Sequence, residues 1–315
     1  MNIPATWTEP VREALYTAFS VIGPDRIKLL TGGLSGAPVF WISIAGMSYL
    51  LRLDSPVEGI ADPRRWHRCL HIAAEAGVSP RVLFTGASGV SITDFITPDP
   101  TGSFWRQERR HALGQVGDLL RRLHAAPAFP PLIDYLDGVR ALAVPVIDAK
   151  PLAAFDQVAA VYRRLEPQLV PSHNDVNPRN LLHDGQRLWL VDWAASFQAD
   201  RYIDLAAIGS FVARDAEGAN LLLTAYFDRP PSEGETARFE LARLINHFFY
   251  GGVMLSNSRQ PTQRRNLDAL HLALRIGEPL LDTPEGRAEY GLARLAALVA
   301  AVEDPGFEAI CRLAT

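Results

Sequence analysis

Cysteine is scarce in this chain. Its 315 residues include only Cys69 and Cys311, which are too few for a disulfide framework and do not have the spacing of a metal site. This usage favours a reduced compartment. No stretch approaches the roughly 18 apolar residues that a membrane-spanning helix needs, and the first residues lack the basic and apolar regions of a secretory signal. We therefore expect a cytoplasmic protein with no membrane partner.

An excess of positive charge is also lacking. The formal net charge is −4, which gives no indication of a nucleic-acid partner. Neither internal repeats nor low-complexity segments interrupt the chain. Its 48% hydrophobic and 21% charged residues are typical of a globular enzyme. A chain of this length usually forms two domains or lobes, and nothing in it indicates an oligomeric state.

Three polar residues with a distinctive spacing form the most informative feature: Asp175, Asn180 and Asp192. Transfer of the γ-phosphoryl group of ATP needs one carboxylate to accept the proton of the attacking hydroxyl. It also needs an amide oxygen and a second carboxylate to hold Mg²⁺. Asp175 suits the first role, whereas Asn180 and Asp192 suit the second, because hard ions prefer oxygen ligands. The alternative is that all three are ordinary polar loop residues.

The residues between Asn180 and Asp192 predict a β-hairpin. Residues 181–183 and 187–191 are apolar and compatible with strands. Asp184 and Gly185 between them predict a type I′ turn, in which both central residues have positive φ. Because the two ends of a hairpin lie close together, we expect Asn180 and Asp192 to converge on one point.

This block resembles the aminoglycoside phosphotransferase and choline kinase superfamily, distant relatives of protein kinases. The family signature is H-x-D-x4-N, an apolar run that ends in Asp and an aromatic residue, and then D-L-A. Here it falls on His173, Asp175, Asn180, Asp192-Trp193 and Asp204-Leu205-Ala206. The resemblance implies that Asp175 is the catalytic base, that Asn180 and Asp192 bind Mg²⁺, and that His173 orients the catalytic loop. It also implies that Asp204 braces this loop as a structural residue.

The N-terminal region predicts a nucleotide-binding sheet, with strands at 27–30, 39–44, 47–53, 81–84 and 90–96. A glycine-rich turn follows the first strand and contains Gly32, Gly33, Ser35 and Gly36. Such a turn lets backbone N–H groups approach phosphate, although it is equally compatible with a flexible hairpin. The resemblance implies that the turn covers the ATP phosphates and that Arg52 reaches the α- and β-phosphates. The alternative places Arg52 on the exposed face of an edge strand.

One expected carboxylate is missing. Kinases normally use a Glu in the helix predicted at 62–76 to hold the basic residue of the strand. The family pattern puts it near Trp66 or His67, neither of which can play that part. Glu75 comes about two turns too late. This departure leaves open a non-enzyme alternative, a nucleotide-binding pseudokinase or regulatory module without turnover, although Asp175 and the predicted metal ligands favour an enzyme.

The predicted fold class is α+β: a protein-kinase-like two-lobe fold with a small antiparallel sheet and a larger, mainly helical lobe. The proline-rich break at 97–100 resembles the hinge that meets adenine, so Asp94 and Phe95 are expected near the nucleotide. We place the N-terminal nucleotide-binding lobe at 1–97 and the catalytic and substrate-binding lobe at 98–315. Helices are predicted at 106–125, 151–165 and most of 203–315. Protein kinase activity fits poorly, because no Ala-Pro-Glu block is present.

Aromatic residues near the motif suggest how an acceptor would bind. Trp193 and Tyr250 are candidates for a cation–π wall. Asp200 is either an acid that faces a cationic substrate or a solvated loop residue. The function predicted is an ATP- and Mg²⁺-dependent kinase that phosphorylates a hydroxyl of a small molecule. An amino alcohol similar to choline or ethanolamine, or an aminoglycoside, fits best, but the sequence does not identify the acceptor.

Overall fold

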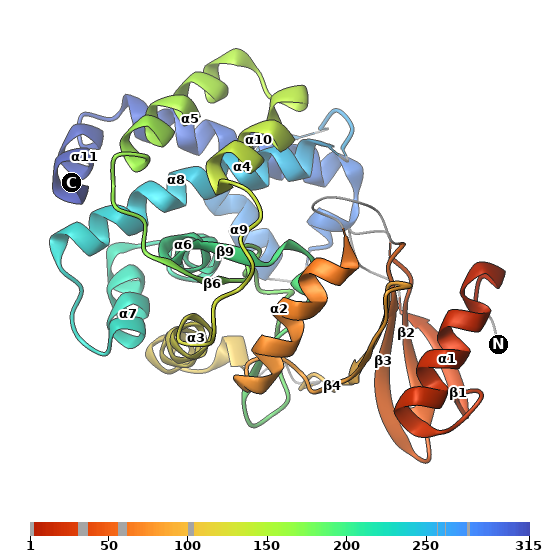
Figure 1. Cartoon of the computed structure of the whole chain (residues 1–315). Coiled ribbons are helices and arrows are strands. Elements are labelled where there is room, and N and C mark those ends of the chain that lie inside the picture. Colours follow the sequence, from red (N-terminus) through yellow and green to blue (C-terminus); the bar gives the residue numbers. More distant parts are fainter. Residues whose placement is uncertain are drawn as a thin grey trace. The chain divides into compact units, whose positions relative to one another are not determined.

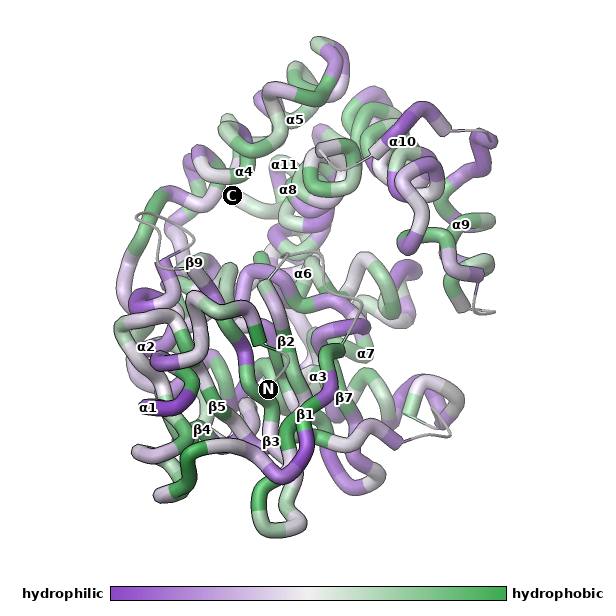
Figure 2. The backbone as a smooth tube through the Cα atoms, turned by 90° about the vertical axis from the view of Figure 1, so that its right-hand side faces the viewer, coloured by the Kyte–Doolittle hydropathy of each residue, from purple (hydrophilic) through white to green (hydrophobic). Residues whose placement is uncertain are grey.

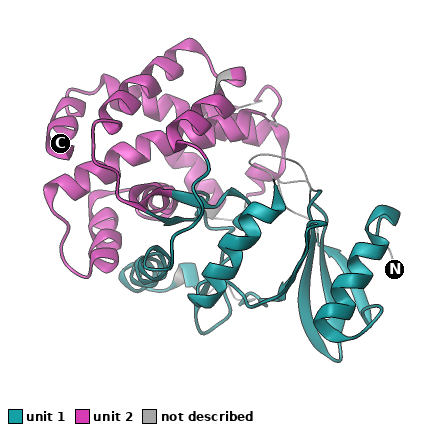
Figure 3. Cartoon of the chain, in the orientation of Figure 1, with its two compact units in different colours: residues 1–132, 170–198 teal, residues 133–169, 199–315 magenta. Residues whose placement is uncertain are grey.

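The computed structural model describes residues 3–30, 37–55, 62–99, 104–256, 258–261, 263–275 and 278–315. The predicted phosphate-binding residues Gly32, Gly33, Ser35 and Gly36 lie outside these ranges. Two compact units make up the chain (Figure 3): residues 1–132 with 170–198 form unit 1, and residues 133–169 with 199–315 form unit 2. The lobe boundary near residue 97 stays a prediction.

Unit 1 contains the predicted antiparallel sheet (Figure 1). Its order is β1-β2-β3-β5-β4, and all neighbouring strands are antiparallel. Its N-terminal elements are η1 (Ala5–Trp7), α1 (Thr8–Phe19), β1 (Arg26–Leu30), β2 (Val39–Ile44), β3 (Met47–Leu53), α2 (Pro63–Glu75), β4 (Val82–Thr85) and β5 (Val90–Asp94). The predicted strands are therefore confirmed, with ends that shift by one or two residues.

Alternation along the strands separates the two faces of this sheet. Phe40 and Ile42 of β2 are buried together with Leu51 of β3, and they belong to one core cluster with Val11 and Leu15 of α1. Helix α1 therefore covers this face. Because side chains alternate between the faces of a strand, the neighbour of Leu51 in the sequence, Arg52, projects to the opposite face. The pattern of the strand thus decides where the predicted phosphate-binding cation points.

The rest of unit 1 carries the motif. Its elements are η2 (Phe104–Arg106), α3 (Arg109–His124), β6 (Leu169–Ser172), β7 (Leu181–His183), β8 (Leu188–Leu190), η4 (Trp193–Ala195) and β9 (Phe197–Asp200). Strand β6 pairs with β9, and β7 pairs with β8. Strand β9 ends in the residues that pass into unit 2.

The predicted hairpin is confirmed, but its turn lies one residue later than expected. Leu181 faces Leu190 across β7 and β8. The Asp184 N–H donates to the Arg187 carbonyl at 3.2 Å, and of the turn residues only Gly185 has positive φ, at 97°. The turn is therefore centred on Gly185 and Gln186, and the type I′ prediction is wrong. Asp184 precedes the turn because its carboxylate accepts the N–H groups of Gln186 and Arg187 at 2.8 and 2.9 Å.

Unit 2 is mainly helical and is arranged around α8 (Figure 1). Its elements are α4 (Tyr135–Ala143), η3 (Val144–Val146), α5 (Ala149–Tyr162), α6 (Arg201–Val212), α7 (Ala216–Phe227), α8 (Glu233–Ser256), α9 (Leu267–Arg275), η5 (Leu280–Asp282), α10 (Pro284–Glu303) and α11 (Phe307–Ala314). Helix α8 packs against α4, α5, α6, α10 and α11. Helix α5 carries hydrophobic residues along most of its length (Figure 2), and its buried residues recur at helical spacing, as expected for a helix with one buried face.

The predicted α+β class, with a small antiparallel sheet and a larger helical part, is confirmed. Helix α4 and strands β6 and β9 were not predicted. Within the described ranges, no helix is both long and apolar enough to cross a membrane.

Candidate active site

The loop after β6 begins with a buried histidine that orients its neighbours. His173 is fully buried. Its Nε2 donates to the Val191 carbonyl at 3.0 Å, whereas its Nδ1 accepts the N–H of Asp175 at 3.3 Å. One imidazole therefore ties the loop to the end of the β7–β8 hairpin. Both of its nitrogens have partners in the protein backbone, which suits the orienting role predicted for it.

Two amide side chains hold the carboxylate of Asp175. Asn177 Nδ2 donates to Oδ1 at 3.0 Å, and Asn180 Nδ2 donates to Oδ2 at 3.2 Å. Both amides also donate to the Asp175 carbonyl, at 3.3 and 2.9 Å. These donors fix the orientation of the carboxylate, which a residue that accepts a proton from a bound hydroxyl needs. The sequence pattern did not point to Asn177.

The hairpin brings the two predicted metal ligands together. The Val191 N–H donates to the Asn180 carbonyl at 3.0 Å, so Asn180 and Asp192 stand at neighbouring ends of the two strands. Because the Asn180 amide nitrogen faces Asp175, its Oδ1 is left to accept or ligate. Asp192 adds a carboxylate whose side chain is 38% exposed. One amide oxygen and one carboxylate fit Mg²⁺, which takes the rest of its shell from water and phosphate.

Asp192 has a left-handed backbone conformation, with φ 65° and ψ 72°. This region is uncommon for residues other than glycine, although Asp and Asn tolerate it best. The conformation ends the strand register of β8 and starts η4. A residue at the predicted metal site therefore carries backbone strain, which is frequent where side-chain placement serves function.

Arg52 of β3 bridges two carboxylates. Its Nη1 donates to Asp192 Oδ1 at 2.6 Å, whereas its Nε and Nη2 donate to the two oxygens of Asp54 at 2.8 and 3.2 Å. The ring of Trp66 in α2 lies 5.2 Å from the guanidinium. Burial alone would lower the pKa of Arg52, but the charges of Asp192 and Asp54 hold that pKa above its ordinary value. Arg52 is 8% exposed, which argues against the alternative of an exposed edge-strand arginine.

Asp54 was not among the predicted site residues, although the sequence carries a signal for it. It stands two residues after Arg52, and residues two apart project to the same side of an extended chain. An acid at this spacing beside a buried arginine is a candidate partner. The carboxylate expected in the following helix is thus found at the end of the strand itself.

Asn174 was missed as well. It has positive φ, 64°, and is 3% exposed. Its Nδ2 donates to the carbonyls of Ala195 and Phe197 at 3.1 and 3.3 Å, and its Oδ1 accepts from the Ser172 hydroxyl at 2.8 Å. This side chain therefore connects the catalytic loop to the segment that follows Asp192.

Helix α2 supports the same segment from its own side. Arg65 Nη2 donates to the Ala194 carbonyl at 2.5 Å, and its Nη1 donates to the Ser196 carbonyl. Both acceptors lie in or directly after η4, which α2 contacts. A forked guanidinium on two nearby backbone carbonyls fixes the position of η4 more firmly than a single bond would.

Trp193 is a packed residue of unit 1. It is 2% exposed, and its ring lies edge-on to His173 and Phe129, at centroid distances of 4.8 and 6.1 Å. Its Nε1 donates to the Leu190 carbonyl at 3.2 Å. This burial speaks against the predicted role as an aromatic wall for a substrate, because a wall needs an accessible face.

Tyr250 of α8, in unit 2, is also covered. It is 3% exposed, and the guanidinium of Arg294 lies 5.4 Å from its ring centroid. The ring of Phe211 is edge-on to it at 5.3 Å. A cation from the protein itself therefore takes the place predicted for a substrate ammonium group.

The two aspartates beyond the motif lie at the start of α6, also in unit 2. Asp200 caps this helix by accepting the N–H of Tyr202 at 3.0 Å, and it accepts the N–H of Gln168 at 3.0 Å. Burial raises the pKa of Asp200 and outweighs these hydrogen bonds. Its place suits a capping residue better than a substrate-facing acid. Asp204 is fully buried in the first turn of α6, and its predicted bracing of the catalytic loop stays a prediction.

The predicted adenine-binding residues end β5. Asp94 pairs with Arg81, which donates from Nε and Nη2 at 3.1 Å each. The Phe95 N–H donates to the Ser48 carbonyl at 3.3 Å. Their role in nucleotide binding stays a prediction. Downstream, the Asp99 N–H donates to the His183 carbonyl at 2.7 Å, so the segment after β5 is attached to the β7–β8 hairpin.

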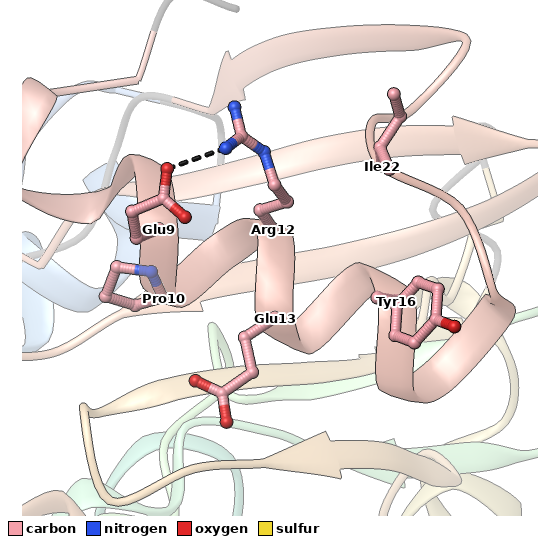
Figure 4. Close-up of a pocket in the computed structure, with 6 residues that line it drawn as sticks. All are labelled: Glu9, Pro10, Arg12, Glu13, Tyr16 and Ile22. Atoms are coloured by element: carbon pink, nitrogen blue, oxygen red, sulfur yellow. Dashed lines mark hydrogen bonds and ion pairs between the residues drawn. The ribbon is translucent and has the colours of Figure 1, made fainter.

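A shallow hollow of about 440 Å³ lies elsewhere in unit 1, beside α1. Figure 4 shows it lined by five residues of this helix and by Ile22 of the following loop, with Arg12 paired to Glu9. None of the predicted site residues contributes to it. In the described parts of the chain, histidine, cysteine and acidic residues do not gather in threes or more as a metal site. The mixed pair of Asn180 and Asp192 stays the predicted metal centre.

Comparison with known proteins gives a consistent result. The sequence pattern of the phosphotransferase enzyme family matches residues 26–238. Protein LicA from Haemophilus influenzae is 26% identical over 238 residues, which cover 71% of this chain and 69% of LicA.

Solved structures are similar over nearly the whole length. The crystal structure of a choline/ethanolamine kinase family protein from Mesorhizobium loti has a TM-score of 0.71 and 23% identity and covers 98% of both chains. Spectinomycin phosphotransferase, solved with ADP and spectinomycin, has a TM-score of 0.63 and 13% identity, and the match covers 96% of this chain and 99% of that one. These similarities confirm the predicted fold class.

Proposed function

This chain belongs to the phosphotransferase enzyme family, as its motif predicted, and we propose that it transfers the γ-phosphoryl group of ATP to a hydroxyl of a small molecule. The observation that carries the proposal is the placement of Asp175. Its carboxylate is oriented by Asn177 and Asn180. Asn180 also stands where the β7–β8 hairpin begins, and Asp192 follows its end.

The residues divide the chemistry in a simple way. Asp175 accepts the proton of the acceptor hydroxyl as the bond to phosphorus forms, and His173 keeps the loop in place through Val191. Arg52 supplies positive charge for the nucleotide phosphates. Phosphoryl transfer depends mostly on positioning and on charge neutralisation, which is what a loop fixed by several hydrogen bonds provides.

Asn180 and Asp192 would hold Mg²⁺. When bound, this ion neutralises charge on the phosphates. The Asn180 amide is oriented by its bonds to Asp175, and Asp192 is placed by its left-handed backbone. ATP as the donor is supported by the family and by the ADP bound to spectinomycin phosphotransferase.

For the acceptor we propose an amino alcohol similar to choline or ethanolamine, or an aminoglycoside. The support comes from the names of the similar proteins, a choline/ethanolamine kinase family protein and spectinomycin phosphotransferase. Fold does not determine the substrate. Because Trp193 and Tyr250 are buried, the proposal does not assign the amino group of the acceptor to them.

The pseudokinase alternative rested on the missing carboxylate in α2. Asp54 supplies a carboxylate to Arg52 from another position. The observation that favoured a non-enzyme is therefore no longer a reason to prefer it.

Substitution of Asp175 tests the proposed base. We expect Asp175→Asn to lower kcat by about 10²–10⁴-fold, the usual contribution of general base catalysis, while ADP affinity stays close to that of the wild type. Coupled ADP-release assays and calorimetric ADP titration measure the two quantities. Asp118→Asn, which removes an exposed acid of α3, is the control. Loss of ADP binding in Asp175→Asn would mean that the assignment of Asp175 is wrong.

The acceptor is identified by ADP release with purified protein, ATP and Mg²⁺, in the presence of choline, ethanolamine, amino sugars or spectinomycin. A small-molecule kinase is expected to release ADP, with at least one of these classes of acceptor, faster than it does by ATP hydrolysis without an acceptor. If neither ATP nor ADP raises the unfolding temperature in the presence of Mg²⁺, the proposal fails.

A further inference from the structure

The guanidinium of Arg52 has two edges with different partners. The edge formed by Nε and Nη2 is taken by both oxygens of Asp54, and the remaining nitrogen, Nη1, donates to Asp192. Paired hydrogen bonds between a guanidinium and a carboxylate fix orientation as well as distance. Asp54 therefore determines which way Arg52 presents Nη1.

Helix α2 offers no carboxylate for this purpose. Its contact with Arg52 is the ring of Trp66. The acid within α2 is Glu75 in its last turn, about 14 Å further along the helix axis than Trp66. Asp62, which caps the helix, is committed to Arg64 by three side-chain hydrogen bonds. Of the two acids in the described residues 62–75, neither is placed to hold Arg52.

Asp54 is itself held in position. Its N–H donates to the Gly89 carbonyl at 3.0 Å. A Cβ on Gly89 would lie 1.8 Å from the Asp54 carbonyl oxygen, so the turn between β4 and β5 fits closely against it. The Asp54 side chain is 13% exposed and that of Arg52 is 10% exposed. The pair is thus mostly shielded from water and supported by a neighbouring hairpin.

We propose that Asp54 is the positioning residue for Arg52 in nucleotide binding, in the place of the helix carboxylate that this chain lacks. Asp54 holds one edge of the guanidinium in place. Nη1 can then exchange its hydrogen bond to Asp192 for one to a nucleotide phosphate, while the rest of Arg52 stays fixed. This exchange of partners leaves the Asp192 carboxylate available to a metal ion. This inference rests on the proposed function, because it assumes that Arg52 meets phosphate.

Two possible roles of Asp54, positioning of Arg52 and a purely electrostatic effect of its charge, predict opposite changes in nucleotide affinity when Asp54 is removed. Removal of an acid near a phosphate site should strengthen nucleotide binding if only charge matters, because a repulsion is lost. If Asp54 positions Arg52, its removal should weaken binding. In Asp54→Asn one carboxylate oxygen becomes an NH2 group, which faces a guanidinium N–H donor to donor, so one of the two bonds and the negative charge are lost and the guanidinium would be released toward Asp192.

The experiment is calorimetric titration with ADP, with and without Mg²⁺ and in the absence of any acceptor. We expect Asp54→Asn to bind ADP about ten-fold or more weakly, the equivalent of one charge-assisted pair, and Asp54→Glu to recover most of the affinity. Asp62→Asn is a matched control, because Asp62 pairs with an arginine two residues away and its side chain is 18% exposed. That control should stay within about two-fold of the wild type.

A rescue from the helix gives an independent measurement. Trp66→Glu introduced into Asp54→Asn returns a carboxylate to α2 beside Arg52 and should restore part of the ADP affinity, whereas Trp66→Glu alone should not improve it. The proposal is overturned if Asp54→Asn binds ADP as well as the wild type or better, if Asp62→Asn is equally weakened, or if Asp54→Asn does not fold. The last outcome would assign Asp54 to the fold. Absence of ADP binding by the wild type would instead refute the proposed function.

Discussion

Three aspartates of unit 1 have different surroundings, and these surroundings separate their roles. Asp175 is oriented by neutral amides. Asp54 has both oxygens bonded to one guanidinium. Asp192 shares that guanidinium through one oxygen and is the more exposed of the two arginine partners. A carboxylate bonded to a cation through both oxygens, as Asp54 is, is a poor base, and the proposed function accordingly gives the proton to Asp175 and not to Asp54.

Asn174 provides the residue-scale prediction. We expect Asn174→Ala to lower the free energy of unfolding by about 2–4 kcal/mol, because it removes buried hydrogen bonds and because alanine tolerates positive φ less well than asparagine. Asn174→Gly loses the same bonds but adopts this conformation freely, so it should retain about 1 kcal/mol more than the alanine variant. Urea unfolding measures both values. Equal stability of the two variants would contradict the strain argument.

At this scale the sequence selects candidates for the reaction more readily than the residues that hold these candidates in place. Asp175, Asn180 and Asp192 were identified because phosphoryl transfer requires particular groups at a particular spacing. Asn174 could not be assigned in the same way, since its role depends on backbone conformation and on contacts with distant carbonyls, and Asp54 was missed although its spacing from Arg52 is a signal. Trp193 was expected to face a substrate because it adjoins Asp192, but neighbouring residues in a strand–turn segment can face opposite directions.

At the scale of elements, the turn between β4 and β5 controls a residue of the site. Gly89 has φ +87°, and its carbonyl accepts the N–H of Asp54. The backbone of this turn therefore fixes the position of Asp54 directly after β3. Any residue with a Cβ at this position would push against that strand end.

Gly89→Ala tests this coupling. Alanine at positive φ costs about 1–2 kcal/mol, and displacement of the Asp54 carbonyl should add about 1–3 kcal/mol through overpacking. We also expect weaker ADP binding. Gly46→Ala is the matched control, because Gly46 has φ +79° and a Cβ added there would meet nothing within 4 Å; it should show the strain alone. Urea unfolding and ADP titration measure the effects, and identical behaviour of the two variants would refute the coupling.

Elements with clear periodicity or turn residues were predictable from the sequence. The five strands of the sheet and helices α2 and α3 were found close to their predicted positions. Strands β6 and β9 were not, because each pairs with a partner that is distant in the sequence and is not joined to it by a turn. The hairpin turn was predicted one residue too early, since the side chain of Asp184 bonds to the backbone ahead of Gly185.

At the scale of the whole molecule, the two units differ in how they bury charge. Unit 2 encloses Arg294, which is 0% exposed. Its guanidinium lies against the rings of Phe211, Tyr250 and Tyr290 and donates to the Tyr290 hydroxyl from Nη2 at 2.6 Å. Aromatic faces and a hydroxyl replace a carboxylate as the partners of this cation. Such a core disfavours any further positive charge.

Two histidines share that core. Burial lowers the pKa of His271 to about 3, helped by the charges of Arg294, Arg214 and Arg243. Burial, with Arg294 next in effect, also holds the pKa of His247 well below its ordinary range. The Nδ1 of His271 accepts from Arg214 Nη1 at 3.1 Å, so a second proton on the ring would face a donor. Both histidines are therefore neutral in the folded protein at neutral pH.

Acid should consequently destabilise unit 2 before it titrates most carboxylates. Below about pH 6.5 these histidines bind protons in the unfolded chain but stay neutral in the folded protein. The free energy of unfolding therefore falls as the pH drops from about 6.5 toward about 3, by about 1.4 kcal/mol per pH unit for each histidine. The stabilising contribution of the neutral histidines is fully present above about pH 6.5.

We expect the unfolding temperature to fall between pH 7.5 and pH 5.0, and His271→Gln to reduce that fall. Scanning calorimetry measures it and separates the two units if they unfold in separate transitions. His111→Gln, at an exposed position of α3, is the control. If His271→Gln and the wild type lose the same stability over this range, proton exclusion by this core is not what makes the protein sensitive to acid.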